Sequence, residues 1–226
     1  MKDDIICDSS AIISLTDSCL IDVFYFLAPK FAGKFLIPAS VEDECVLRPM
    51  KMKSHAMSAM RIGKALRDGV LCKYSEEVQG LSEEIAFLAN NSFFIGKKPL
   101  RLVHGGEAQM LAAAVRAGSK NLLMDERTTR MLCEEPHALA RHLEEEFKCG
   151  VKIDFETLSK FGRIVGKPSF LRSTELLIIA YEKGYLSHFG EMERPALEAS
   201  LYSLKFAGTS TSFDEIDSFL GKKGLK

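Results

Sequence analysis

Residues 105–127 constrain the fold of this chain more than any other stretch, because they place one acid at the start of a helix and another just after a strand. The helix is predicted by Gly105 and Gly106 at its start, by apolar residues at helical spacing, and by Gly118 where a left-handed C-terminal cap belongs. Glu107 then lies in the first turn of this helix.

The apolar run at residues 122–124 ends at Asp125 and Glu126. A short continuous apolar run is typical of a buried parallel strand, which here delivers acids at its carboxyl end. Open α/β sheets bind their ligands at that edge. The same switch from strand to helix occurs near the start of the chain, where apolar residues 5–7 stop at Asp8.

Short apolar runs with strand character alternate with helical patterns along the whole chain. The predicted strands are residues 4–7, 34–37, 121–124 and 163–166, with 70–74 as a weaker candidate. This alternation predicts an α/β fold, with three α/β/α layers around a mainly parallel central sheet. We expect a single domain, 1–226, with a helical insertion at about 132–160 and a helical C-terminal portion at about 167–226.

Composition restricts the partners and the compartment. The formal net charge is -1 and the sequence pI is about 6.5, so the overall charge does not favour a polyanionic partner. The six cysteines are scattered without a Cys-x-x-Cys pair, which indicates reduced thiols. The N-terminal residues match no signal or transit peptide, and no apolar stretch has the length of a membrane span. We therefore expect a soluble, cytoplasmic protein without a membrane partner.

Four acids fall at equivalent places in this predicted fold. Asp8 and Asp125 follow strands, whereas Glu44 and Glu107 lie near the starts of helices. Strand ends and helix starts of this kind share one edge of a parallel sheet, so the four side chains are expected to converge. Each acid alone is also explained as a helix cap or a partner of a helix dipole. Clustered carboxylates favour a neutralising cation, and oxygen ligands without His or Cys favour Mg²⁺ or Mn²⁺.

The segments that carry these acids resemble the PIN domain family. IICDSSAIISL is similar to the first-strand motif of that family, and LIPASVEDECV to the segment of its second acid. GGEAQMLAAAVRAG and NLLMDERTTR resemble the GEA-type helix and terminal acidic pair of one PIN subgroup, and the later LLIIAYEKGYL resembles its C-terminal layout. The resemblance extends over most of the chain, except for roughly 132–160.

The resemblance implies a ribonuclease that uses Mg²⁺ or Mn²⁺ to hydrolyse RNA phosphodiester bonds. It implies Asp8, Glu44, Glu107 and Asp125 as the four acids, with Asp8, Glu107 and Asp125 as direct metal ligands and Glu44 orienting water or completing a second metal site. The subgroup often has two aspartates where this chain has Asp125 and Glu126, so either residue or both can be the ligand. The implied partners are RNA, an antitoxin or other protein, and a second copy of the chain, in a toxin-like or RNA-processing role.

A basic segment follows Glu44 in the sequence. Residues 48–73 carry seven basic residues against one acid, with an apolar stripe that predicts one amphipathic helix. The candidate contacts to the RNA backbone are Arg48, Lys51, Lys53 and Arg61, with Lys97, Lys98 and Arg101 as a second rim. The alternative for this segment is a solvated helix face. Ser10 either helps to hold a phosphate or a metal-bound water, or only caps a helix.

Three other readings compete with the nuclease. A phosphatase of the haloacid-dehalogenase type needs a second aspartate two residues after Asp8, where this chain has Ser10. A PIN-like scaffold would bind RNA or protein without cutting it. A zinc module built on Cys133, His137, His142 and Cys149 matches no common spacing of zinc ligands.

Overall fold

A five-stranded parallel sheet forms the centre of the computed structural model, which describes residues 3–222. The ends of the expected 1–226 domain, residues 1–2 and 223–226, lie outside the described residues. The strand order is β3-β2-β1-β6-β8, and all four pairings are parallel. The strands are β1 Ile5–Cys7, β2 Phe35–Ile37, β3 Leu71–Lys73, β6 Asn121–Leu123 and β8 Ser169–Leu171. The expected α/β fold with a mainly parallel sheet is confirmed.

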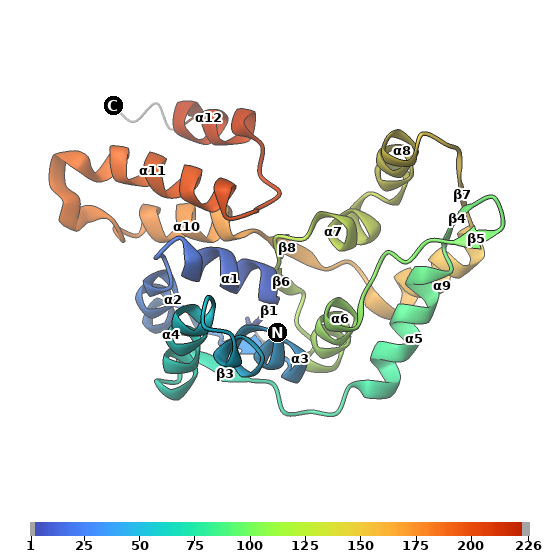
Figure 1. Ribbon diagram of the computed structural model, residues 1–226, viewed down its shortest axis with the longest axis horizontal. Helices are drawn as coiled ribbons and strands as arrows, with labels where there is room; N and C mark the ends of the chain where they lie inside the picture. Colours follow the sequence, from blue (N-terminus) through green and yellow to red (C-terminus); the bar gives the residue numbers. More distant parts are fainter. Residues whose placement is uncertain (1–2, 223–226) are drawn as a thin grey trace.

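The strands are short and apolar because both faces of the sheet are buried. Cys7 and Leu123 belong to one core cluster, whereas their neighbours Ile6 and Leu122 belong to the other. Successive side chains of a strand point to opposite faces, so each strand supplies both cores. The molecule therefore has helices on both sides of the sheet (Figure 1).

The two helical layers differ in composition. The first core cluster includes residues of α1 Ser9–Asp17, α2 Asp22–Leu27, α4 Ala56–Arg67, α10 Ser173–Glu182, α11 Glu193–Phe206 and α12 Phe213–Lys222. The second includes residues of α5 Gln79–Asn90, α6 Gly105–Ala117, α7 Arg127–Glu134, α8 Pro136–Phe147 and α9 Phe155–Val165. In Figure 1, α10, α11 and α12 stack at the upper left, whereas α5, α8 and α9 lie on the right.

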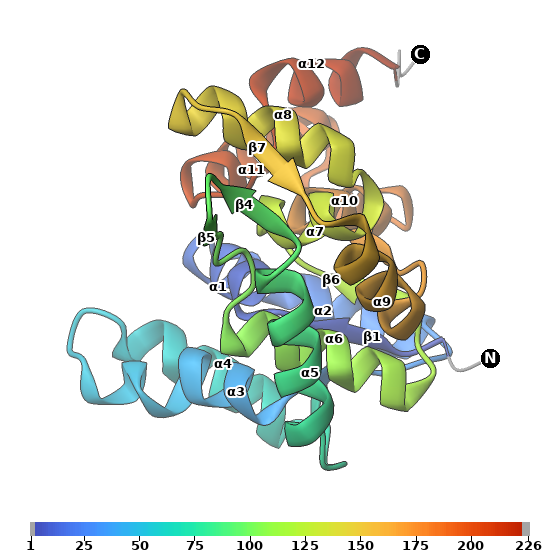
Figure 2. The ribbon, with the colours of Figure 1, turned by 90° about the vertical axis from the view of Figure 1, so that its right-hand side faces the viewer.

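A second sheet was not expected from the sequence. The strands β4 Phe93–Ile95, β5 Lys98–Pro99 and β7 Val151–Ile153 form an antiparallel sheet in the order β5-β4-β7 (Figure 2). The expected helical insertion at about 132–160 contains the helix α8, and it also contains β7, which pairs with β4. This pairing ties the inserted segment to a distant part of the chain.

The predicted strand at 163–166 is wrong. Its first residues end α9, and Gly166, with φ 73°, follows the helix. Asp154 begins this helix, because its side chain accepts the backbone N–H groups of Glu156 and Thr157 at 3.0 and 3.1 Å. The strand that completes the sheet is β8, a few residues later, so the C-terminal portion from 167 is not wholly helical either.

The single helix expected over 48–73 is broken into shorter pieces, and the helical segments before it are short as well. Pro29 lies where α2 gives way to a 3₁₀ turn, Ala28–Lys30. The helix α3 Ala39–Glu42 continues as a π-helix, Asp43–Leu47, and a 3₁₀ turn, Pro49–Lys51, precedes α4. Within residues 3–222 no single helix is long and apolar enough to span a membrane, and only the bent pair Ser9–Asp17 and Asp22–Lys30 meets that test when both parts are combined.

Candidate active site

Asp8 lies at the carboxyl end of β1 and caps α1. Its side chain is only 4% exposed, and Oδ2 accepts the backbone N–H of Ser10 at 3.0 Å and the Ser10 hydroxyl at 2.5 Å. The same hydroxyl oxygen accepts the backbone N–H of Asp125 at 3.1 Å. Ser10 therefore links the ends of β1 and β6, and it holds the Asp8 carboxylate in one orientation.

The protonation of Asp8 is perturbed by its surroundings. The pKa of Asp8 is raised to about 6; burial is the largest cause, and the negative charge of Glu107 contributes in the same direction. The hydrogen bonds from Ser10 oppose this rise without cancelling it. Asp8 is thus a buried acid close to a second acid, which is the electrostatic situation that a bound cation would relieve.

Glu44 reaches the start of α6 from the π-helix Asp43–Leu47. One of its carboxylate oxygens, Oε1, lies 2.9 Å from the position that a Cβ atom on Gly106 would occupy. Among residues 3–222, the side chain of Glu44 makes no hydrogen bond or ion pair. Burial raises the pKa of Cys45, and the charges of Asp8 and Glu44 add to this effect, so both acids lie near that thiol.

Glu107 lies in the first turn of α6, next to Gly106. Its Oε2 accepts the backbone N–H of His104 at 3.0 Å, which is a helix-capping contact. The helix ends as expected at Gly118, with φ 64°. Asp8, Glu44 and Glu107 therefore come from three separate elements and approach one another at the carboxyl edge of the sheet.

Asp125 and Glu126 point in different directions. Asp125 is 3% exposed, and its two oxygens accept the backbone N–H and the hydroxyl of Ser173, each at 2.8 Å. Burial raises the pKa of Asp125, while the Ser173 hydrogen bonds lower it. Glu126 caps α7 by accepting the backbone N–H groups of Thr128 and Thr129 at 2.7 and 2.6 Å. Asp125 thus anchors α10, whereas Glu126 faces the open side of the site.

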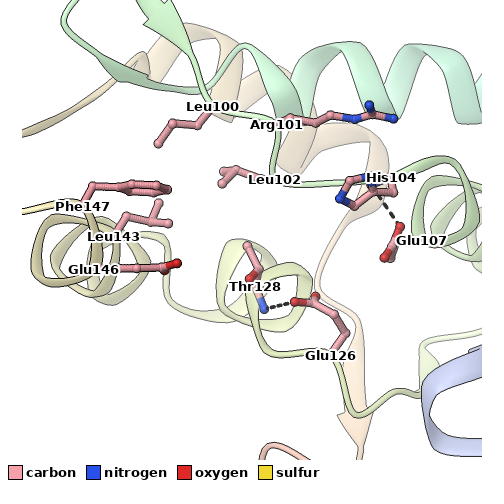
Figure 3. A pocket seen from close by; sticks show the side chains of 10 residues that line it. All are labelled: Leu100, Arg101, Leu102, His104, Glu107, Glu126, Thr128, Leu143, Glu146 and Phe147. Atoms are coloured by element: carbon pink, nitrogen blue, oxygen red, sulfur yellow. Dashed lines mark hydrogen bonds between the residues drawn. The ribbon is translucent and has the colours of Figure 1, made fainter.

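An open pocket of about 390 Å³ adjoins these acids (Figure 3). Its lining residues are Leu100, Arg101, Leu102, His104, Glu107, Glu126, Thr128, Leu143, Glu146 and Phe147. Figure 3 shows Glu107 and Glu126 at one end of the pocket and the Phe147 ring at the other. The inserted segment supplies the second end, because Leu143, Glu146 and Phe147 belong to α8.

The acids do not form a closed metal cage. In the part of the chain that the structure describes, no group of three or more His, Cys, Asp or Glu side chains is gathered closely enough to enclose a metal ion. The same holds for the zinc candidates, where the ring of His137 instead lies 5.7 Å from that of Phe155 and burial raises the pKa of Cys133 to about 12. The approach of Asp8, Glu44 and Glu107 is therefore looser than a preformed site.

The basic candidates lie mostly on the surface. Arg48 pairs with Asp43 at 2.5 Å, and Arg61 contacts the sulfur of Cys19 at 3.8 Å. Lys51 ends the 3₁₀ turn Pro49–Lys51 and Lys53 follows it before α4, and both are exposed. Of the second rim, Arg101 lines the pocket beside Glu107, whereas Lys97 lines a separate pocket and Lys98 lies in β5.

Several functional candidates were missed from the sequence. Ser173, which holds Asp125, is the first residue of α10. Arg172 caps this helix and forms a part-buried ion pair with Glu175 at 2.8 Å. Glu175 at the third position of the helix, where it accepts the backbone N–H of Arg172, was the available sequence signal for this helix start. Glu146 and Phe147 carried no such signal, because their contact with the site depends on how α8 packs.

No protein-family model, curated protein or solved structure matches the chain.

Proposed function

We propose that this chain is a metal-dependent endoribonuclease of the PIN type, which hydrolyses RNA phosphodiester bonds with Mg²⁺ or Mn²⁺. The observation that carries the proposal is the approach of Asp8, Glu44 and Glu107 at the carboxyl edge of the sheet, where Glu44 lies against Gly106. Capping or dipole interactions would explain each acid alone, but they do not require the three to meet. The resemblance of the motifs to PIN domains points to the same chemistry.

The donor set fits a hard divalent cation. All of the candidate ligands are carboxylate oxygens, and Glu44 has no hydrogen bond or ion pair to lose among the described residues. Burial raises the pKa of Asp8, and a neighbouring cation would lower this pKa again. Asp8, Glu44 and Glu107 would hold the ion, and we propose Glu126 as the fourth acid because it faces the same pocket as Glu107.

When bound, a divalent ion lowers the pKa of water and stabilises the charge that develops on the leaving oxygen. The residues of the chain supply orientation. Ser10 fixes the Asp8 carboxylate through two hydrogen bonds, and His104 fixes one oxygen of Glu107 through its backbone N–H. Glu44, whose side chain has no hydrogen bond or ion pair within residues 3–222, would be the third residue that holds the ion.

We propose that the RNA backbone runs along the basic loop, residues 48–55, which leads from the π-helix to α4. Lys51 and Lys53 are exposed and have no ion pair within residues 3–222, so they are available to phosphates. Arg48 and Arg61 lie on either side of them along the chain. In the cell we propose a cytoplasmic toxin-like or RNA-processing role, with an antitoxin or another protein, or a second copy of the chain, as further partners.

Cleavage of RNA with added Mn²⁺ tests this function. Asp8→Asn and Glu107→Gln should abolish cleavage while the variants remain folded, because each removes a carboxylate from the site. Glu145→Gln is the matched control, since Glu145 is an exposed acid of α8 that does not line the pocket. Cleavage that persists in both site variants, or in excess chelator, would contradict the proposal.

A non-catalytic scaffold is the second candidate. It is favoured by the engagement of both Asp125 oxygens with Ser173, and by the absence of a closed group of metal ligands among residues 3–222. Calorimetric titration with Mn²⁺ separates the two functions. Absence of binding, together with retained RNA affinity, would support the scaffold.

A further inference from the structure

The pocket beside the acids has two chemically different ends. Glu107, Glu126 and His104 lie at one end, whereas the apolar side chains of Leu100, Leu102, Leu143 and Phe147 lie at the other, with the Glu146 carboxylate beside them (Figure 3). Its volume of about 390 Å³ lies within the range of pockets that bind small organic groups. A ligand that fills it must therefore combine an apolar planar or aliphatic part with a part that tolerates the acidic end.

The inserted segment builds the apolar end and holds it in place. Leu139 and Leu143 anchor α8 in the second core cluster, and β7 pairs with β4 directly after the helix. Phe147 ends α8 and is followed by Lys148 in a left-handed conformation, with φ 54°. The Phe147 ring stays 47% exposed and points toward Leu102 across the pocket (Figure 3).

We infer that this pocket is a nucleobase subsite, which receives one unpaired nucleotide next to the RNA bond that is cleaved. The inference rests on the proposed nuclease function. A nucleotide has a flat apolar base and an anionic phosphate, and the two ends of the pocket match these parts when a cation neutralises Glu107 and Glu126. The base then lies against Phe147 and Leu102, since aromatic side chains are the usual stacking partners of unpaired bases.

The orientation of the nucleotide follows from charge. A phosphate is repelled by Glu146 in the absence of a cation, so the base and not the phosphate occupies the end of the pocket near α8. Arg101, which is exposed on the rim, is available to the phosphate on the other side of the base. A base in this pocket cannot also be stacked and paired in a duplex, so the substrate is single-stranded at this nucleotide.

Glu146 gives the subsite a preference among bases. Its carboxylate points into the pocket in Figure 3, and an ionised carboxylate only accepts hydrogen bonds. Guanine presents two adjacent donors, its N1–H and its amino group, which match the two oxygens. Uracil presents one donor between two carbonyl oxygens, which the carboxylate repels. The subsite therefore favours guanine over uracil.

Binding measurements on the chain with all its acids intact test the subsite, with an RNA whose phosphodiester bonds are replaced by a non-hydrolysable linkage. A short single-stranded RNA of this kind is titrated with Mn²⁺ present, both with all its bases and with one base removed at each position in turn. Phe147→Ala should weaken binding of the intact RNA about tenfold. It should not weaken further the RNA that lacks the base which enters the pocket. Phe87→Ala is the control, because Phe87 is 65% exposed on α5 and lies outside the pocket.

The outcomes separate the subsite from the nuclease. Equal effects of Phe147→Ala on the intact RNA and on every base-depleted RNA would overturn the subsite, even if the unsubstituted chain cleaves RNA. Failure of the unsubstituted chain to cleave RNA would overturn the proposed function, whatever the binding cycle gives. Glu146→Gln should reduce the preference for guanine over uracil at that position, and an unchanged preference would remove Glu146 from the subsite.

Discussion

The side chain of Glu44 lies against Gly106, although the two residues are more than sixty positions apart in the sequence. Its Oε1 atom is only 2.9 Å from the position that a Cβ atom on residue 106 would occupy. The glycine thus lets a carboxylate of the π-helix approach the first turn of α6. Gly106 does not need a left-handed backbone, so its lack of a side chain is what matters here.

Gly106→Ala should therefore disturb the site more than the fold. The added methyl group pushes the Glu44 carboxylate away from the first turn of α6. We therefore expect Mn²⁺ affinity to fall by about tenfold, while the free energy of unfolding changes by no more than about 1 kcal/mol. Calorimetry and thermal unfolding measure the two effects. Gly105→Ala is a matched control in the same turn, because no atom lies within 4 Å of its added Cβ. Equal loss of affinity in both variants would contradict the role of the Glu44 contact.

The pKa of Asp8 predicts how stability depends on pH. An acid whose folded pKa is raised, here from 3.8 to about 6, binds its proton more tightly in the folded state, so its contribution to stability is lost as pH rises from about 4 to above 6. By the 1.36 kcal/mol per pKa unit, this loss is about 3 kcal/mol. Without metal, Asp8→Asn should therefore unfold at a higher temperature than the unsubstituted chain at pH 7.5, and the difference should shrink at pH 4.5.

Added Mn²⁺ reverses the order at pH 7.5. An ion at the site stabilises the ionised Asp8, so the melting temperature of the unsubstituted chain should rise with Mn²⁺ while that of Asp8→Asn stays nearly constant. Thermal unfolding at several Mn²⁺ concentrations provides the measurement. A similar rise in both proteins would show that Asp8 is not a ligand.

The basic loop, together with Arg61 of α4, leads to a prediction about how RNA affinity depends on salt concentration. Replacing Lys51, Lys53 and Arg61 together by alanine should weaken RNA binding and reduce the slope of log affinity against log salt by up to about 2, at roughly 0.7 per phosphate contact for single strands. The control replaces three exposed lysines elsewhere on the surface, Lys120, Lys167 and Lys183, by alanine, and so changes the net charge by the same amount. A salt slope that changes equally in both proteins would point to overall charge and not to the loop.

The sequence predicted the central sheet well and the outer elements less well. The apolar runs of β1, β2 and β6 are bounded by Asp8, Pro38 and Asp125, so their ends were readable. The run at 163–166 was ambiguous, because a short apolar segment suits a strand or one face of a helix equally. The segment is helical because Asp154 caps α9 and because Ile164 and Val165 pack against the second core cluster.

For the candidate site too, the sequence predicted the positions of some residues and not of others. Asp8 and Glu107 were readable because each sits at a local boundary, where a strand or a helix changes conformation. The contact of Glu44 with Gly106 and the position of Phe147 depend on packing between distant elements, which no local pattern encodes. The antiparallel pairing of β4 and β7, across more than fifty residues, sets the position of α8 and was equally hidden.

The contact of Ser173 with Asp125 leads to the last prediction. Each oxygen of this buried carboxylate accepts a hydrogen bond from Ser173, one from its backbone N–H and one from its hydroxyl. Ser173→Ala removes the hydroxyl bond from a carboxylate that is only 3% exposed, and we expect a loss of about 1–3 kcal/mol in the free energy of unfolding. Ser58→Ala is the control, because Ser58 donates to Asp17 at 2.6 Å on the exposed surface, where the same deletion should cost less than about 1 kcal/mol. Denaturant unfolding at pH 7.5 measures both. If the two losses are equal, burial of Asp125 does not set the cost, and its role as an anchor of α10 would be contradicted.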